Sequence, residues 1–301
     1  MLLLASFMVF ALVHVIPGDP ISVYLTESAL NPEAEAALRD ELNLDDPLLV
    51  RYGKWLGHAA QGDLGKSFRT KEPVMTTVLA SLPATLQLAG AALVVAVVVG
   101  IPAGIVSAAS RNGWVDLGSR WVALGGLAVP NFFMGIILVY VFAFKWGVLP
   151  ATGYVSVLDS PVDGVRSTIL PALALGTSLA AVLFRQMRGA LLDVLNEDYI
   201  RTARAKGLRN QTVIVRHGVR NAMLPVVTLL GMYSGILIGG AVVTEQVFAY
   251  PGIGTQAVAA IRFRDIDILQ GVILLTVVAV ILGNLVTDVV YARLNPRIRL
   301  T

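Results

Sequence analysis

Apolar residues occur in long uninterrupted runs along this chain, and the charged residues gather between the runs. A helix that crosses a membrane needs about 20 consecutive apolar residues. Windows of this kind, free of Asp, Glu, Lys and Arg, lie at 74–110, 121–144, 167–184, 221–244 and 268–287. The pattern therefore predicts an all-α, polytopic membrane protein, and an apolar stretch at 1–16 supplies the sixth transmembrane helix.

The N-terminal stretch 1–16 is short for a span and lacks the basic residues that begin a secretory signal. Pro17-Gly18-Asp19-Pro20 follows it, where a signal peptidase would need small residues. We expect a first transmembrane helix that begins upstream of Met1 or whose start is misassigned. After it we expect an outer subdomain with short helices at 17–84, one of them starting at Asn31, a five-helix core at 85–292 that includes a cytoplasmic loop at 191–220, and a cytoplasmic tail at 293–301.

The distribution of charge predicts which side of the membrane each loop faces. The loops at 110–120, 185–220 and 293–301 carry 13 Lys and Arg against 4 Asp and Glu, whereas the loops on the opposite side carry 9 against 15. Cytoplasmic loops are the ones that carry an excess of positive charge. We therefore expect a protein of the bacterial inner membrane, with both termini and the segment 185–220 in the cytoplasm.

The sequence lacks the residues that several kinds of chemistry require. It has no Cys, and its three His show no pairing typical of metal ligands, so we expect no metal site. Gly65-Lys66-Ser67 matches the end of a phosphate-binding P-loop, but Ala60 stands where that motif requires its first glycine. We therefore expect no catalytic residue, no bound cofactor and no ATPase in this chain.

A basic segment between the fourth and fifth predicted spans carries the signals of one short helix. Asn196 is a capping residue, acids follow at once, and Gly207 comes directly after a basic last turn. A helix of about 10 residues is marginal alone in water, so it must pack against something. Ala203 and Gly207, one turn apart, offer a small-residue face to a partner. On these residues alone, a docking helix and a loop that only fixes topology are equally good interpretations.

The spacing of this segment resembles the signature loop of ABC importer permeases. Arg201-Thr202-Ala203 is followed by Gly207, a hydrophobic position near Ile214 and then Leu224-Pro225. The family consensus begins Glu-Ala-Ala, and Arg201-Thr202 in its place is similar to the peptide-transporting branch. Further stretches that resemble this branch are Pro17-Gly-Asp-Pro20, Leu42-Asn-Leu-Asp-Asp-Pro47, Gly62-Asp-Leu-Gly65, Val129-Pro130, Gly147-Val-Leu-Pro150 and Glu245-Gln-Val-Phe-Ala-Tyr-Pro-Gly-Ile-Gly254. Together they resemble the B-type permease subunit of dipeptide, oligopeptide and nickel ABC importers.

This resemblance implies a non-catalytic subunit that moves peptides across the cytoplasmic membrane. It implies as partners a homologous second permease, two ATPase subunits that bind ATP and Mg, and an extracytoplasmic substrate-binding protein. It also implies that the short helix is a coupling helix seated in a cleft of the ATPase. The residues expected to contact the ATPase are Glu197, Asp198, Tyr199, Arg201, Ala203, Arg204, Lys206, Gly207 and Leu208.

Polar residues within spans are costly, so each one is a candidate for function. Gln87, Asn131 and Asn284 are candidates for the translocation path. Hydrogen bonds between helices are the commoner use of residues such as Asn131 and Asn284, and Gln87 fits either role. Arg185 and Arg188 are expected to extend to the membrane interface. The candidates for an outer gate or a contact with the binding protein are Glu245, Tyr250, Pro251 and Gly252, and a plain Pro-Gly turn is the alternative.

Two other classes of membrane protein are alternatives to the importer subunit. A secondary transporter would be expected to carry an intramembrane acid or broken helices in symmetric halves. An intramembrane protease would need a Ser and His or a pair of Asp within the bilayer, and His14 has no evident partner of this kind. Within the importer family, nickel or another small solute is the alternative substrate, and the lack of a His, Cys or Met cluster in the spans favours peptides.

Overall fold

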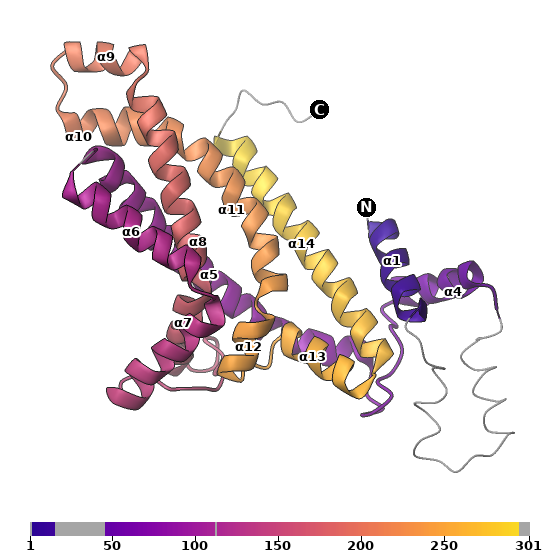
Figure 1. Ribbon diagram of the computed structural model, residues 1–301. Helices are drawn as coiled ribbons and strands as arrows, with labels where there is room; N and C mark the ends of the chain where they lie inside the picture. The colour runs from indigo at the N-terminus through magenta and orange to yellow at the C-terminus, as the bar shows by residue number, and fades with distance from the viewer. Residues whose placement is uncertain (1, 16–45, 112, 295–301) are drawn as a thin grey trace, which may run out of the picture. The chain divides into compact units, whose positions relative to one another are not determined.

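The computed structural model describes residues 2–15, 46–111 and 113–294 (Figure 1), and the residues it describes are helical apart from loops and one isolated bridge between Lys66 and Pro73. The helices are α1 Leu2–Val15, α4 Leu48–Ala60, α5 Val74–Ala109, α6 Trp114–Ala128, α7 Asn131–Leu138, α8 Pro161–Leu195, α9 Asp198–Ala205, α10 Asn210–Thr212, α11 Arg220–Gly240, α12 Val242–Phe248, α13 Ile253–Phe263 and α14 Ile266–Leu294. Two π-helical segments, Val139–Lys145 and Val213–Val219, continue α7 and lead into α11.

Four of the predicted spans are confirmed by long apolar helices. Their bounds are Val74–Ala109, Pro161–Leu195, Asn210–Leu237 and Ile266–Leu285. Helix α1 is helical as expected but only 14 residues long, which is short for a span. The helix expected to start at Asn31 lies outside the described residues.

The window 121–144 is not the continuous helix that its composition predicts. It is divided between α6 and a second segment, Asn131–Lys145, and the two are bent by 104°. Val129 between them is extended, with φ −84° and ψ 121°. Pro130 favours a break at this point, because a proline disfavours helical geometry in the residue before it and has no N–H to donate.

The described chain forms two compact units, of which the first comprises 1–83 and 252–278. Within it, α1 packs on α4 through aromatic rings, with Phe7 and Tyr52 5.1 Å apart and Phe10 and Trp55 5.6 Å apart between ring centroids. Its apolar core consists of Leu64, Val74, Val78, Ile253, Ala260, Ile268 and Val272. Helix α4 and the loop that follows it are therefore tied to apolar helices by side-chain packing.

The second unit, 84–251 and 279–301, contains the larger core, built on α5, α8 and α11. Helices α5 and α8 approach so closely that a Cβ added at Gly104 would lie 2.8 Å from the carbonyl oxygen of Phe184. A Cβ at Gly176 would lie 2.7 Å from the carbonyl oxygen of Ala92. Small residues at such contacts allow helix backbones to meet, which is the usual packing of helices in membranes.

Candidate functional site

The short helix predicted near Gly207 is present as α9, eight residues long, and Figure 1 shows α9 and α10 set off from the bundle at the end of α8. Glu197, rather than the expected Asn196, occupies the N-cap position, and it makes no side-chain cap hydrogen bond. Asn196 instead donates from Nδ2 to the carbonyl oxygen of Leu192 at 3.0 Å. Gly207 has φ +78°, the left-handed conformation that ends a helix and that glycine adopts without strain.

Ala203, expected on the contact face of α9, is buried against the chain itself. Ile200 is fully buried and Ala203 is 8% exposed, and both belong to a small cluster with Val213, against which Val194 and Leu195 pack. An eight-residue helix cannot persist without such packing, and these positions supply the apolar edge that it buries against its own chain. Ala203 therefore faces inward, whereas Gly207 is exposed with nothing within 4 Å of an added Cβ.

The outward face of α9 is polar. Arg201 and Asp198 are joined by a 3.1 Å ion pair, with 73% and 91% of their side chains exposed. The hydroxyl of Tyr199 accepts a 2.7 Å hydrogen bond from Nδ2 of Asn221. The other exposed residues of the predicted coupling set are Glu197, Arg204, Lys206, Gly207 and Leu208. The structure thus brings most of the predicted set to one accessible surface.

An ion-pair cluster that the sequence did not predict lies among α5, α6 and α8. Asp116, on the first turn of α6, is fully buried. Its Oδ1 accepts hydrogen bonds from Oγ of Ser107 at 2.6 Å and from Nε of Arg188 at 2.7 Å. Its Oδ2 accepts from Nη2 of Arg188 at 2.9 Å and lies 3.4 Å from Nη2 of Arg120. We call Ser107, Asp116 and Arg188 the polar clamp.

The polar clamp corrects the expectation that Arg188 extends to the membrane interface. Its guanidinium binds both oxygens of Asp116, and only 19% of the Arg188 side chain is exposed. Arg185, one turn earlier in α8, is exposed. The signal available in the sequence is Asp116, an acid in the otherwise basic loop 110–120.

Gln87 is engaged in hydrogen bonds within the chain. Its Nε2 donates to Oγ1 of Thr168 at 2.7 Å and to the carbonyl oxygen of Val155 at 3.0 Å, and its Oε1 accepts from the N–H of Val157 at 3.0 Å. The hydroxyls of Thr168 and Tyr250 are 2.7 Å apart. These groups fasten the loop that precedes α8, and we call Gln87, Thr168 and Tyr250 the neutral network.

The four residues predicted as an outer gate do not form one exposed surface. Glu245 and Tyr250 are fully buried, Gly252 is buried, and Pro251 is exposed. Oγ1 of Thr85 donates to Oε1 of Glu245 at 2.6 Å, and the N–H of Tyr250 donates to the carbonyl oxygen of Glu245 at 2.8 Å. Burial raises the pKa of the Tyr250 hydroxyl. Glu245 and Tyr250 thus organise the turn after α12.

The structure does not join the three candidates for the translocation path. Asn131 is half-buried at the first residue of α7, and Asn284 is exposed on α14. Neither residue is among the hydrogen-bond partners of Gln87 described above.

The P-loop-like stretch has no anion-binding character in the structure. Oγ of Ser67 donates to Oδ2 of Asp265 at 2.5 Å, and the carboxylate of Asp267 lies 3.7 Å from a Cβ added at Gly65. Two acids beside this loop would repel a phosphate.

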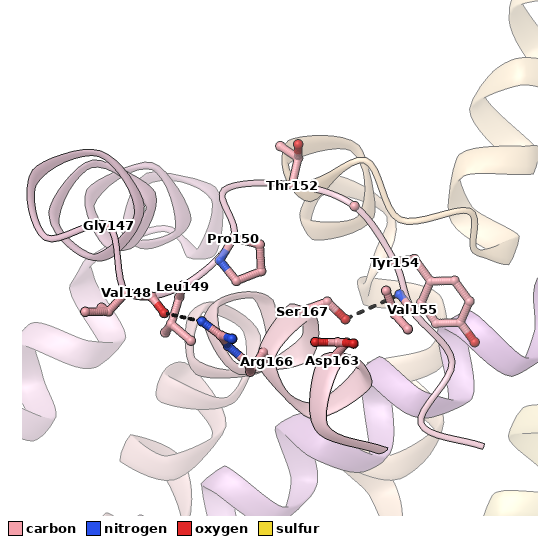
Figure 2. A pocket seen from close by; sticks show the side chains of 11 residues that line it. Gly147, Val148, Leu149, Pro150, Thr152, Tyr154, Val155, Asp163, Arg166 and Ser167 are labelled. Carbon is pink, nitrogen blue, oxygen red and sulfur yellow. Dashed lines mark hydrogen bonds between the residues drawn. The ribbon is translucent and has the colours of Figure 1, made fainter. Parts of the chain in front are cut away.

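A shallow cavity of about 520 Å³ lies between the loop after α7 and the start of α8. Figure 2 shows Arg166 and Asp163 of α8 beside the loop from Gly147 to Val155. Nη2 of Arg166 donates to the carbonyl oxygen of Val148 at 3.2 Å, and Oγ of Ser167 accepts from the N–H of Val155 at 3.3 Å. The loop is held on α8 by these bonds, and among the described residues no cluster of His, Asp and Glu could hold a metal ion.

Comparison with known proteins decides the family. Residues 100–300 match the family of binding-protein-dependent transport system inner membrane components, and residues 1–89 match the N-terminal region of such membrane components. The chain belongs to this family. It is thus the non-catalytic, multi-pass inner-membrane permease subunit of an ABC importer, which works with ATPase and substrate-binding partners and leaves ATP to the ATPase.

Two relatives match the permease along nearly its whole length. It is 41% identical to the di/tripeptide transport system permease protein DppB of Pseudomonas aeruginosa, over 98% of this chain and 94% of the relative. It is also 41% identical to the glutathione transport system permease protein GsiC of Escherichia coli K12, over 99% and 94%. An inward-facing structure of the MetNI methionine ABC transporter shares the fold, with a TM-score of 0.62 and 17% identity over 74% of this chain and 99% of that one.

Proposed function

We propose that this permease imports short peptides and that α9 docks on an ATPase subunit. The two relatives are permeases for di- and tripeptides and for glutathione, which is itself a peptide of three residues. A short peptide is the substrate chemistry that they share. The lack of a metal-binding cluster among the described residues gives no support to nickel as the alternative substrate.

The exposed face of α9 is the observation that carries the docking proposal. Its inner face, at Ile200 and Ala203, is fully used within the chain, while Tyr199, Arg201 and Leu208 remain accessible. Gly207 ends the helix abruptly and leaves room for a close approach. We propose that the ATPase receives this outward face, and that Ala203 contributes by holding the helix in place rather than by contact.

We further propose two ATPase subunits, a homologous second permease and an extracytoplasmic binding protein as partners. The excess of basic residues in 185–220 supports a cytoplasmic location of α9 and of both termini. ATP-driven closure of the ATPases would then pull on α9 and switch the spans between inward-open and outward-open forms. A reporter fused at Thr212 should be cytoplasmic and one fused at Glu72 external, and the reverse result would overturn this orientation.

Among the candidates for the path and the outer gate, we retain the accessible ones. Asn131 begins α7 directly after the sharp bend, and Asn284 is exposed on α14, so both are proposed to line the path. Pro251 is exposed in the loop between α12 and α13 and is proposed to contact the binding protein. Gln87, Glu245 and Tyr250 are proposed to support these surfaces from inside the chain.

The docking proposal is tested by reversing the charge of Arg201 on the outward face of α9. Arg201→Glu should leave the permease in the membrane but lower the amount of ATPase that purifies with it and the uptake that depends on it. Lys145→Glu, which reverses the charge of an exposed residue at the end of the segment that continues α7, is the control. ATPase recovery and uptake equal to those of the control would show that α9 does not dock.

The substrate is tested with the assembled importer and its binding protein in lipid vesicles. ATP-dependent uptake should be found for a labelled dipeptide or tripeptide. Uptake of glutathione without uptake of ordinary dipeptides and tripeptides would indicate a preference for peptides with a γ-linked residue. Uptake of all of them would indicate a general preference for short peptides. Uptake of Ni²⁺ without uptake of any of these peptides would reject the peptide proposal.

A further inference from the structure

We infer that Asp116 and Arg188 are positioning residues that transmit movement of α9 from α8 to α5 and α6. The inference rests on the proposed docking role of α9, and it concerns how a pull on that helix reaches the membrane helices. The path consists of an apolar contact from α9 to α8 and then the polar clamp.

The first step is the attachment of α9 to the end of α8. Ile200 and Ala203 pack on Val194 and Leu195, which belong to the last turn of α8. A Cβ added at Gly218 would lie 2.9 Å from Cδ1 of Leu191, so the segment after α10 also presses against α8 here. Movement of α9 must therefore displace the end of α8 or break these contacts.

The second step is the link from α8 to its neighbours. Arg188 lies two turns before Leu195, and its guanidinium bonds both oxygens of Asp116 through two separate N–H groups. A two-point bond of this kind fixes direction as well as distance. Ser107 joins the same carboxylate from α5, so a shift of Arg188 is felt by two further helices.

The clamp holds α6 at the end near α9, and a different contact holds its other end. There, a Cβ added at Gly126 would lie 3.5 Å from the side chains of Ala181 and Thr177 of α8. Between the two contacts, α6 exposes large apolar side chains, with Trp121 68% and Val122 77% exposed. Without the clamp, the α9-proximal end of α6 would lose its directed polar link to α8.

Stability alone does not explain a buried ion pair. Replacing both charges of such a pair by neutral groups is often neutral or stabilising, whereas removing one partner is strongly destabilising. The close contact of Gly104 with Phe184 already holds α5 against α8 without any charge. The distinctive contribution of the pair is therefore a rigid, directed link between α8 and α6.

The test compares variants of the assembled importer in vesicles, with ATPase recovery, ATP hydrolysis and peptide uptake measured separately. Arg188→Lys keeps the charge but loses the two-point bond, and Asp116→Asn with Arg188→Gln removes both charges together. Arg185→Lys, on the exposed side of the same helix, is the control. We expect normal ATPase recovery and ATP hydrolysis in Arg188→Lys, with peptide imported per ATP about tenfold lower.

The double variant should behave as Arg188→Lys does, because neutral partners leave no buried charge but also no directed link. Peptide uptake per ATP at the wild-type level in Arg188→Lys would overturn the inference. Loss of ATPase recovery in that variant would also overturn it, because the ion pair would then serve to maintain the structure of α9. Should Arg201→Glu retain full ATPase recovery, the docking proposal would fail instead, so the two failures are distinguishable.

Discussion

The two ends of α8 are held by different chemistry. Near α9, Arg188 joins α8 to α6 through full charges in the polar clamp. Near the start of α8, Thr168 belongs to the neutral network with Gln87 and Tyr250. A buried neutral hydrogen bond contributes about 1 kcal/mol, whereas a buried charge left without its partner costs several times more. Neutral hydrogen bonds at the start of α8 are sufficient to hold the preceding loop in place. The charged hydrogen bonds near α9 fix the orientation of α8 relative to α6.

The largest effect is expected from removing one charge of the clamp. Arg188→Ala leaves the fully buried Asp116 carboxylate without its main partner, which should destabilise the subunit by about 3–5 kcal/mol. Asp116→Ala should cost less, because the Arg188 side chain already reaches solvent and can turn toward it. The midpoints of thermal unfolding of the two purified variants, with Arg185→Ala as the control, show which variant is less stable. Equal midpoints for both would show that burial does not distinguish the two charges.

A smaller effect is expected from the centre of the neutral network. Gln87→Leu removes the donor to Thr168 and Val155 and the acceptor of the Val157 N–H, for a loss of about 2–3 kcal/mol. The loop at 155–157 should become sensitive to protease while ATPase recovery stays normal. Asn284→Leu is a matched control on an exposed helical position. A protease-resistant loop in Gln87→Leu would mean that packing, rather than this amide, holds it.

Thr85 tests the hydrogen bond to the buried carboxyl group of Glu245. Thr85→Val keeps the shape of the side chain but removes the hydroxyl that donates to Glu245, at an expected cost of about 1.5–2 kcal/mol. Thr85→Ser retains the hydroxyl and should restore most of the lost stability. Unfolding midpoints of the three proteins decide this, and identical values for the Val and Ser variants would remove the hydroxyl from the explanation.

The smallest effect is expected at Tyr250. Tyr250→Phe removes the neutral hydroxyl that hydrogen-bonds Thr168 but keeps the ring against Tyr154, so the loss should be about 1 kcal/mol. Tyr250→Ala, which also removes the ring contact, should lose considerably more. If the Phe variant were as unstable as the Ala variant, the hydroxyl would matter more than a neutral bond allows.

The sequence predicted features whose signals are local. Four spans followed from apolar windows, and the end of α9 followed from Gly207, because one glycine after a basic turn is sufficient to mark a helix end. The bend at Pro130 also had a local signal, but composition alone concealed it within an apolar window.

Features that depend on distant contacts were missed. Arg188 and Asp116 are 72 residues apart, and nothing in either neighbourhood specifies the other. The inward orientation of Ala203 depends on contacts with Val213 and Leu195, which lie outside α9 on either side of it in the sequence. Fold class is therefore accessible from patterns, whereas the links between helices require the three-dimensional structure.

The bend between α6 and α7 has a consequence for the surroundings of the chain. In a continuous helix, the carbonyl oxygen of Gly126 would accept from the N–H of residue 130, but residue 130 is proline. Hydrocarbon offers no donor, so broken backbone at membrane depth requires water or a polar protein group beside it. Wherever this bend meets the hydrocarbon layer, lipid tails must therefore be excluded from it.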